Sequence, residues 1–399
     1  MKSLNIIGTA LAVMLSGSVA TVTSEQAVQD KHLKQAQAVF SWVAETEGSY
    51  IHPNQEVRRM VPGDIDTPLG VFATDTIQEG ETLAKVPWAN IIASSDPEDE
   101  SEQLPCGLVV ILAKELELGD KSKYAPYVAY LNDEAYGQIP TSWTDDALDL
   151  MLEIIDEKLA PEDQIDWFRE ASEYCKVDYE DDPWIRKAIL LIIQRSDDEI
   201  MIPAYDSYNH RNGNWTNTRT HCEPGEYHET KARKRIEKGE QILLSYYQSH
   251  FYGTAEMLRD YGFVEFYPQR WHYTEEEYHF NLDYDENDQV KLTWDDDYNY
   301  NPFMDANPKE VVKARDWFQK EIMRLRGLRP RFESNTYEMP SSQFDQNKIF
   351  LEANILAMEL AKESIDAHLL EELHDLEGDD EEEDDDEEMA TDEETEAEL

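Results

Sequence analysis

The spacing of apolar residues changes character along this chain. Residues 28–47 follow the helical period, whereas TPLGVFATDTIQEGETLAKVP at residues 67–87 reads as two strands around a Gly-Glu turn. Between residues 98 and 195 the helical period returns in PCGLVVILAKELELG, TDDALDLMLEIIDEKL and DPWIRKAILLIIQR, with Asp, Thr or Pro near each start. We therefore expect a strand pair followed by a mainly helical segment.

Strand-like sequence resumes after residue 199. HFNLDYDENDQVKLTW, at residues 279–294, predicts a hairpin. Its acidic turn is not expected to bind calcium, because Asp288 takes the glycine position of a calcium loop and Trp294 takes that of its closing glutamate. Two further helices are predicted by NPKEVVKARDWFQKEIMRLRG and FDQNKIFLEANILAMELAKESIDAHLLEELHDLE.

The first residues have the pattern of an export signal. Lys2 precedes the apolar run LNIIGTALAVML, and Ser18-Val19-Ala20 offers small residues before a cut after Ala20. The run is short for a membrane span, so we expect no stable membrane insertion once the signal is removed. This predicts a lumenal or secreted protein. The alternative is the plastid of an alga with secondary plastids, although Thr21 stands where such leaders usually have an aromatic residue.

The net charge of the chain limits the class of macromolecule that it can bind. The 399 residues include 87 acids and 35 Lys or Arg, for a net charge of -52. Such a chain repels phosphate backbones, so we expect no nucleic-acid partner and favour a basic or lysine-bearing protein. Residues 377–399 hold 16 of the acids and almost nothing apolar, which predicts a disordered acidic tail.

Neither the cysteines nor the histidines form a recognisable framework. Cys106, Cys175 and Cys222 are few and widely spaced, so at most one disulfide can form beside a free thiol. His210, His221, Cys222 and His228 are irregularly spaced, unlike the paired ligands of structural zinc sites. We expect no metal.

The most informative stretch runs from Ile202 to Trp271. It contains IPAYDSYNHRNGNW and later RIEKGEQILLSYYQSHFYGTAEMLRDYGFVEFYPQRW. An Asn-His pair after an Asp, a Gly-Glu turn leading into a strand that ends in tyrosines, and Tyr-Gly-Phe resemble the SET methyltransferases related to the Rubisco large-subunit lysine methyltransferase and the actin-histidine methyltransferase. The resemblance covers roughly Leu69 to Trp271. It implies an α+β fold, with small SET-type sheets, a helical insertion and a C-terminal helical lobe.

The resemblance, together with the N-terminal signal and the acidic tail, divides the chain. We expect a signal peptide at 1–20, a helical lead at 21–66, the SET N-terminal part at 67–97, a helical insertion at 98–195, the SET C-terminal part at 196–298, a substrate-binding helical lobe at 299–376 and the tail at 377–399.

By the same resemblance, two segments hold S-adenosylmethionine. The backbone of Leu69-Gly70-Val71-Phe72 would lie along the cofactor, since a glycine lets main-chain groups approach without a Cβ in the way. Leu69 stands where the family often has a basic residue. Asn209-His210 would contact the cofactor's polar end and adenine, with Asp206 bracing the turn. Taken alone, Gly70 is compatible with a simple turn, and Asn209-His210 with a capped turn carrying a structural histidine.

Tyr246 matches the family's catalytic tyrosine, and Tyr261 and Phe263 would line the cofactor pocket or the lysine channel. A buried tyrosine hydroxyl can bond the substrate nitrogen while its ring walls a dry channel. Two departures leave Tyr247 and Tyr252 as alternatives. Tyr247 stands where the family has Gly, and Thr254 replaces an expected Asn.

The sequence therefore predicts a monomeric enzyme that methylates a protein side chain, with lysine preferred over histidine as the acceptor. Three other functions stay open. A catalytically inactive SET module would bind peptides without turnover. An acidic lumenal protein would buffer calcium, and an acidic-tailed chaperone would bind basic proteins without needing residues 202–271.

Overall fold

The computed structural model describes most of the chain. The described residues are 30–94, 104–134, 139–156, 158–159, 166–197, 199–246, 252–273, 278–295, 308–333 and 339–379. The predicted signal peptide lies outside them, as does the acidic tail beyond residue 379. Within these ranges, no helix has the length and apolar character needed to cross a membrane.

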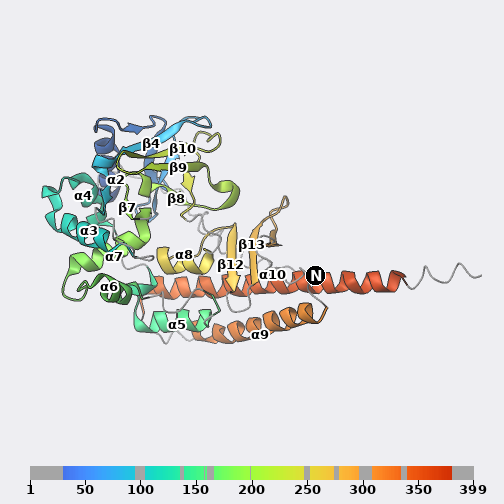
Figure 1. Ribbon diagram of the computed structural model, residues 1–399. Helices are drawn as coiled ribbons and strands as arrows, with labels where there is room; N and C mark the ends of the chain where they lie inside the picture. The colour runs from blue at the N-terminus through green and yellow to red at the C-terminus, as the bar shows by residue number, and fades with distance from the viewer. Residues whose placement is uncertain are drawn as a thin grey trace, which may run out of the picture.

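Small β-sheets form the upper part of the molecule in Figure 1. The largest has the order β1-β4-β10-β9, and all its pairs are antiparallel. The strands of this sheet are β1 (Tyr50–Ile51), β4 (Thr82–Pro87), β9 (Thr218–Glu223) and β10 (Tyr227–Ala232). The pairing of β4 with β10 joins the predicted N-terminal and C-terminal SET parts across the helical insertion.

The remaining strands around this sheet are short. They are β2 (Gln55–Arg59) with β3 (Leu69–Ala73), β5 (Ile92–Ala93) with β7 (Ile200–Met201) and β6 (Ser196–Asp197), and β8 (Asn209–His210) parallel to β11 (Leu243–Leu244). The two strands expected at residues 67–87 are thus β3 and β4. They pair with different neighbours, so they do not form a hairpin with each other.

Helices pack around these strands in one hydrophobic core. They are α2 (Lys31–Ala44), α3 (Cys106–Leu118), α4 (Ala125–Asp133), α6 (Trp167–Cys175) and α7 (Pro183–Arg195). The start of α7 shows why the sequence folds this way. Asp182 caps it by accepting hydrogen bonds from the main-chain nitrogens of Trp184 and Ile185, and Pro183 occupies the first turn, where no hydrogen-bond donor is needed.

A second hydrophobic core lies in the lower half of Figure 1, where α10 runs beneath β12 and β13 and above α5 and α9. Its elements are α5 (Asp145–Ile155), α8 (Thr254–Tyr261), β12 (Gln269–Tyr273), β13 (Tyr278–Tyr284), β14 (Val290–Trp294), α9 (Pro308–Glu333) and α10 (Ser341–Asp379). The predicted hairpin at 279–294 is confirmed as β13 and β14. α10 continues to Asp379, so the first residues that we assigned to the disordered tail are helical.

Part of the predicted insertion belongs to this second core. The Asn347 side chain in α10 donates a hydrogen bond to the main-chain oxygen of Ala147 in α5 over 2.9 Å. Arg324 in α9 donates to the main-chain oxygens of Glu153 and Ile154. The apolar face of α5 therefore covers α10, while the other insertion helices cover the sheets.

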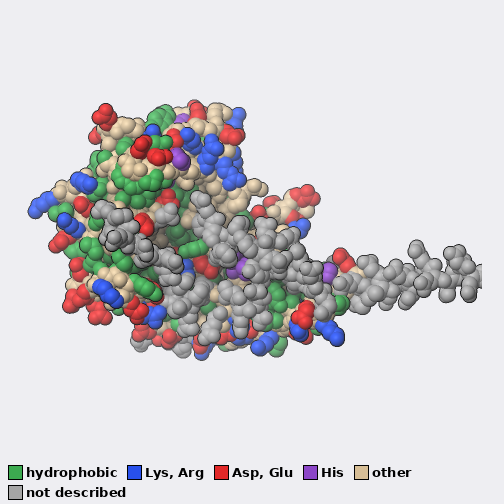
Figure 2. Space-filling model, viewed as in Figure 1, with side chains coloured by type: hydrophobic (Ala, Val, Ile, Leu, Met, Phe, Trp, Pro, Cys, Tyr) green, Lys and Arg blue, Asp and Glu red, His purple; other side chains and the backbone are tan. Residues whose placement is uncertain are grey.

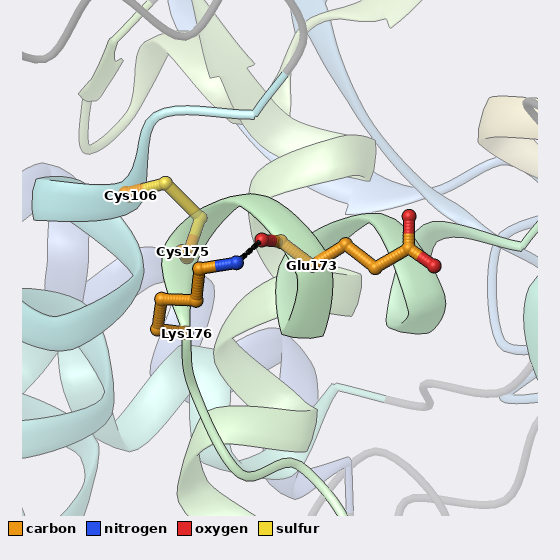
Figure 3. The surroundings of a disulfide bond; sticks show 4 residues. All are labelled: Cys106, Glu173, Cys175 and Lys176. Carbon is orange, nitrogen blue, oxygen red and sulfur yellow. Dashed lines mark hydrogen bonds between the residues drawn. A yellow bond between two sulfur atoms is a disulfide. The ribbon is translucent and has the colours of Figure 1, made fainter.

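A disulfide joins Cys106 at the start of α3 to Cys175 at the end of α6, as Figure 3 shows. The Lys176 ammonium donates a hydrogen bond to the main-chain oxygen of Glu173 beside it. Cys222, on β9, is the free cysteine. The pairing that the sequence left open thus connects two helices of the insertion.

Short 3₁₀ turns connect several elements. They are η1 (Trp88–Asn90), η2 (Gly119–Lys121), η3 (Pro140–Ser142), η5 (Tyr205–Ser207) and η6 (Gly213–Trp215). Figure 2 shows acidic side chains spread over the described surface on this face, whereas Lys and Arg gather where Figure 1 places β9 and β10.

Candidate functional site

The two predicted cofactor segments meet. The Asn209 side-chain nitrogen donates a hydrogen bond to the main-chain oxygen of Leu69 over 2.8 Å. A Cβ placed on Gly70 would lie 2.6 Å from Nε2 of Gln241 and 3.0 Å from Nδ2 of Asn209. The absence of a side chain at Gly70 thus leaves room for two amide side chains. The expected N-terminal and C-terminal SET parts therefore contact each other at Leu69, Gly70 and Asn209.

The other two members of the first segment point elsewhere. Val71 is fully buried in the first core, and its main-chain oxygen accepts a hydrogen bond from the nitrogen of Ile242 over 2.8 Å. The guanidinium carbon of Arg58 lies over the ring of Phe72, 3.5 Å from the centre of that ring. These contacts hold the backbone of β3 in place beside β8 and the residues that lead into β11.

His210 is held by both of its ring nitrogens. Nδ1 accepts a hydrogen bond from the main-chain nitrogen of Tyr246 over 3.0 Å, and Nε2 lies 3.0 Å from a carboxylate oxygen of Glu265. The side chains of His210 and Glu265 are 2% and 1% exposed. Because the ring is committed to these partners, any polar contact of His210 with a cofactor falls to its backbone.

Glu265 is a site residue that the sequence analysis missed. Besides facing His210, its carboxylate accepts hydrogen bonds from the Asn212 amide over 2.7 Å and from the Thr254 hydroxyl over 3.1 Å. A single glutamate in a loop carries no local signal of such a role. Its place two residues after Phe263, within an otherwise apolar and aromatic stretch, is the only hint in the sequence.

Tyr246 lies in an aromatic cluster. Its ring centre is 4.7 Å from that of Tyr261 and 5.1 Å from that of His210, and Phe263 lies 6.4 Å from Tyr261. Burial raises the pKa of Tyr246 to about 12, so its hydroxyl is neutral at physiological pH. The structure therefore brings the predicted tyrosines, Phe263 and the Asn-His pair together.

One detail of the prediction for Tyr246 was wrong. We expected a strand that ends in tyrosines, but β11 ends at Leu244. The main-chain nitrogen of Tyr246 bonds to a histidine side chain instead of to a neighbouring strand. The alternation of side chains along a strand therefore does not decide how Tyr246 is oriented.

The alternative tyrosines differ from Tyr246 in their surroundings. The hydroxyl of Tyr252 is hydrogen-bonded to Asp260, and its ring lies 5.8 Å from the guanidinium of Arg259. Tyr252 therefore contacts both members of the buried Arg259–Asp260 ion pair in α8. Tyr247 falls outside the described residues.

Asp206 acts differently from our expectation. Rather than bracing its own turn, its carboxylate accepts a hydrogen bond from the Tyr127 hydroxyl over 2.9 Å and lies 3.5 Å from Arg195. Arg195 also pairs with Glu134. Burial raises the pKa of Asp206 to about 6, against the lowering effect of Arg195. Burial also raises the pKa of Glu134, but Arg195 and His32 together have the larger effect and lower that pKa to about 2. Asp206 in η5 therefore connects that turn to α4 through Tyr127 and to α7 through Arg195.

Of the four residues that raised the question of zinc, Cys222 and His228 are cross-strand partners on β9 and β10, whereas His210 lies on β8. His221 and Cys222 lie on β9, His228 is buried on β10 against the ring of Tyr205, and His210 is committed to Glu265. Across the described ranges, no group of three or more His, Cys, Asp or Glu side chains is arranged to hold a metal ion.

Comparison with known proteins shows which proteins this chain is similar to. Residues 69–247 match the SET domain family, whereas no curated protein sequence matches the chain. A structure of Rubisco LSMT bound to sinefungin and monomethyllysine is similar, with a TM-score of 0.51 at 15% identity, over 84% of this chain and 92% of that one. The SET domain of LSMT bound to methyllysine and AdoHcy gives 0.51 at 13% identity, with the same two coverages. Residues 69–247 are therefore similar to a SET domain, and the chain has the α+β fold of those structures, as its sequence predicted.

Proposed function

We propose that this protein transfers a methyl group from S-adenosylmethionine to a protein side chain, and that the acceptor is lysine. The proposal rests on one observation above all. Tyr246, whose hydroxyl has a pKa raised by burial to about 12, packs against the ring of His210, the neighbour of Asn209, within the segment that matches a SET domain. The similar LSMT structures are bound to methylated lysine and to sinefungin or AdoHcy, which supports the same ligand classes here.

The residues around Gly70 fit such a cofactor. The side-chain nitrogen of Gln241 is buried without a hydrogen-bond partner in the described part of the chain, and it lies 2.6 Å from where a Cβ on Gly70 would stand. A buried donor without a partner costs free energy, and a polar ligand would remove that cost. Asn209 and the backbone of Leu69 to Phe72 would hold the methionyl end of the cofactor, which supplies an electrophilic methyl group when bound.

The aromatic cluster suits the chemistry of the acceptor. Methyl transfer is an in-line displacement, so the attacking nitrogen must be neutral and held close to the methyl carbon. A dry site lowers the pKa of a lysine ammonium and favours the neutral amine. The hydroxyl of Tyr246 keeps its proton at physiological pH, so it can accept from or donate to that amine, while Tyr261 and Phe263 exclude water.

The net charge of the chain and its proposed compartment limit the class of protein substrate further. The net charge of -52 would attract a basic protein and attract lysine side chains in particular. We propose that the protein acts as a monomer in the secretory pathway, lumenal or secreted. The apolar N-terminal sequence supports this location, and so does the Cys106–Cys175 disulfide, since such bonds persist in oxidising compartments.

Single-turnover methylation tests the proposal. Wild-type protein is mixed with S-adenosylmethionine labelled in its methyl group and with a pool of basic, lysine-containing proteins, and the label on lysine and histidine is separated. We expect label on lysine. Tyr246→Phe should slow transfer at least about a hundredfold, because the lost hydroxyl acts mainly in the transition state. Cofactor affinity should stay within about a factor of three.

Tyr252→Phe and Tyr247→Phe are the matched controls. Wild-type transfer by Tyr246→Phe, with loss in either control, would move the catalytic role to that other tyrosine. Cofactor binding without transfer by the wild type would instead favour a catalytically inactive SET module that binds peptides.

A further inference from the structure

We infer that Glu265 is a positioning residue for Tyr246 and acts on it through the tautomer of His210. The inference rests on the proposed function, because it assigns Glu265 a part in methyl transfer. It begins from a hydrogen-bond path that can be followed atom by atom, from Glu265 to His210 and from His210 to the main chain of Tyr246.

The main-chain nitrogen of Tyr246 fixes the state of one ring nitrogen. A main-chain N–H can only donate, so Nδ1 of His210, at 3.0 Å, must accept and must carry no proton. The neutral ring then carries its proton on Nε2. That nitrogen lies 3.0 Å from Glu265, whose carboxylate can accept it. The two contacts together select a single tautomer, which is the usual way that a second partner sets the state of a histidine.

A second path reaches the neighbouring residue. The Ser245 hydroxyl donates to the side-chain oxygen of Asn212 over 3.1 Å, and the Asn212 amide donates to Glu265 over 2.7 Å. Glu265 is therefore connected to Ser245 through Asn212 and to Tyr246 through His210. Since Ser245 and Tyr246 are adjacent, the two paths close a ring around the end of β11.

The carboxylate itself is well fixed. Glu265 is 3% exposed, and its other oxygen accepts a hydrogen bond from the Thr254 hydroxyl at the start of α8. Thr254 stands where the resemblance led us to expect an asparagine. This departure from the family pattern thus has a function in the structure, because Thr254 links α8 to the same carboxylate.

The consequence concerns the approach of Tyr246 to the acceptor. β11 has only two residues and ends at Leu244, so Tyr246 takes part in no strand pairing with the described residues. Its backbone nitrogen bonds to His210, and its ring packs against His210, Tyr261 and the first hydrophobic core. If His210 took the other tautomer, Nδ1 would carry a proton and face the Tyr246 N–H, and the tyrosine would shift. Catalytic rates fall steeply with such displacements.

Nitrogen NMR shifts report the tautomer of His210 directly, whether or not the protein is active. In protein labelled with ¹⁵N at histidine, the nitrogen shifts of His210 should show a protonated Nε2 and an unprotonated Nδ1, assigned by comparison with His210→Asn. Glu265→Ala should move the Nδ1 signal toward the protonated state. Glu265→Gln should retain the wild-type pattern, because its amide oxygen can accept from His210 and Asn212 while its NH₂ donates to Thr254.

A kinetic test reads the positioning. In single-turnover methylation, Glu265→Ala should slow transfer at least about tenfold while cofactor affinity stays within about threefold, and Glu265→Gln should transfer within about threefold of wild type. Glu321→Ala removes another buried carboxylate, which pairs with Arg324 in α9. It serves as the control for general loss of stability and should transfer at the wild-type rate.

The outcomes separate the two claims. An unchanged His210 tautomer in Glu265→Ala, or a wild-type transfer rate in that variant, would overturn the role of Glu265. So would an equal loss of rate in Glu321→Ala. A wild-type protein that transfers nothing would refute the proposed function instead, and the nitrogen shifts would still show whether Glu265 sets the tautomer.

Discussion

The Asn209 amide donates a hydrogen bond to the main-chain oxygen of Leu69, across 140 positions of sequence. This bond lies where β3 passes β8, beside Gly70. The helical insertion separates the two residues in sequence, yet the small sheets bring them into contact. The proposed cofactor site depends on this junction. β3 supplies backbone that Gly70 leaves uncovered by a side chain, and β8 supplies the amide of Asn209.

Replacing Asn209 tests the cofactor contact. Asn209→Ala should weaken S-adenosylmethionine binding by about 1.5–3 kcal/mol, because it removes hydrogen bonds to a charged ligand. Calorimetric titration of the folded variant measures this. Asn287→Ala, in the exposed turn between β13 and β14, is the control and should bind like wild type. An Asn209→Ala protein with full affinity would exclude Asn209 as a ligand.

Adding one methyl group tests the close approach at Gly70. In Gly70→Ala, the new Cβ would stand 2.6 Å from Gln241 and 3.0 Å from Asn209, so both amides must move. We expect cofactor affinity to fall at least about tenfold, with a lower melting temperature. Gly327→Ala in α9 meets open space and should raise stability by about 0.5–1 kcal/mol. Unchanged cofactor binding in Gly70→Ala would contradict the assigned site.

The disulfide is expected to matter for stability. The bond between Cys106 and Cys175 spans 69 positions, and closing a loop of that size should stabilise the fold by about 2–4 kcal/mol. The double variant Cys106→Ser/Cys175→Ser should therefore unfold at lower urea concentration than wild type. Cys222→Ser, which removes the free thiol, should not differ. Equal unfolding midpoints for all three proteins would show that the bond contributes nothing.

Asp206 should leave a signature in the pH dependence of stability. Its pKa is about 6 in the folded protein, against an ordinary 3.8, so the folded state holds more protons between these values. Its contribution to stability therefore decreases as pH rises through this window, by about 1 kcal/mol from pH 5 to pH 7. Glu134 has a lowered pKa of about 2, and its contribution is lost only below its ordinary 4.5.

The measurement is urea unfolding of wild type and Asp206→Asn at pH 5 and pH 7. Comparing the two proteins cancels the other acidic groups. The free energy of unfolding of wild type should fall by about 1 kcal/mol more than that of Asp206→Asn over this interval. An identical change in both proteins would mean that Asp206 is not perturbed.

The local pattern of the sequence was enough to predict most elements. Helical spacing with a capping Asp predicted α7, and alternation around acidic turn residues predicted β13 and β14. The same spacing showed that α5 has an apolar face, but not that the face covers α10. A helix pattern gives the position of a face and carries no information about its partner.

The candidate site was predictable only where short motifs carry it. Gly70, Asn209 and Tyr246 lie in such motifs; the structure places Asn209 beside Gly70 and packs Tyr246 against His210. Glu265 lies 55 positions from His210 and contacts it only through the fold, so no spacing rule reveals the pair. The end of β11 was also missed: the strand stops at Leu244, and the main-chain nitrogen of Tyr246 bonds to a side chain instead.

The central claim is that the junction of Gly70, Asn209 and Tyr246 holds S-adenosylmethionine, and calorimetric titration of the cofactor into the purified protein tests it most directly. We predict saturable binding at one site per chain in wild type, retained by Tyr246→Phe within about a factor of three and weakened in Asn209→Ala. Absence of heat from wild-type protein that is folded and carries the Cys106–Cys175 disulfide would contradict the claim.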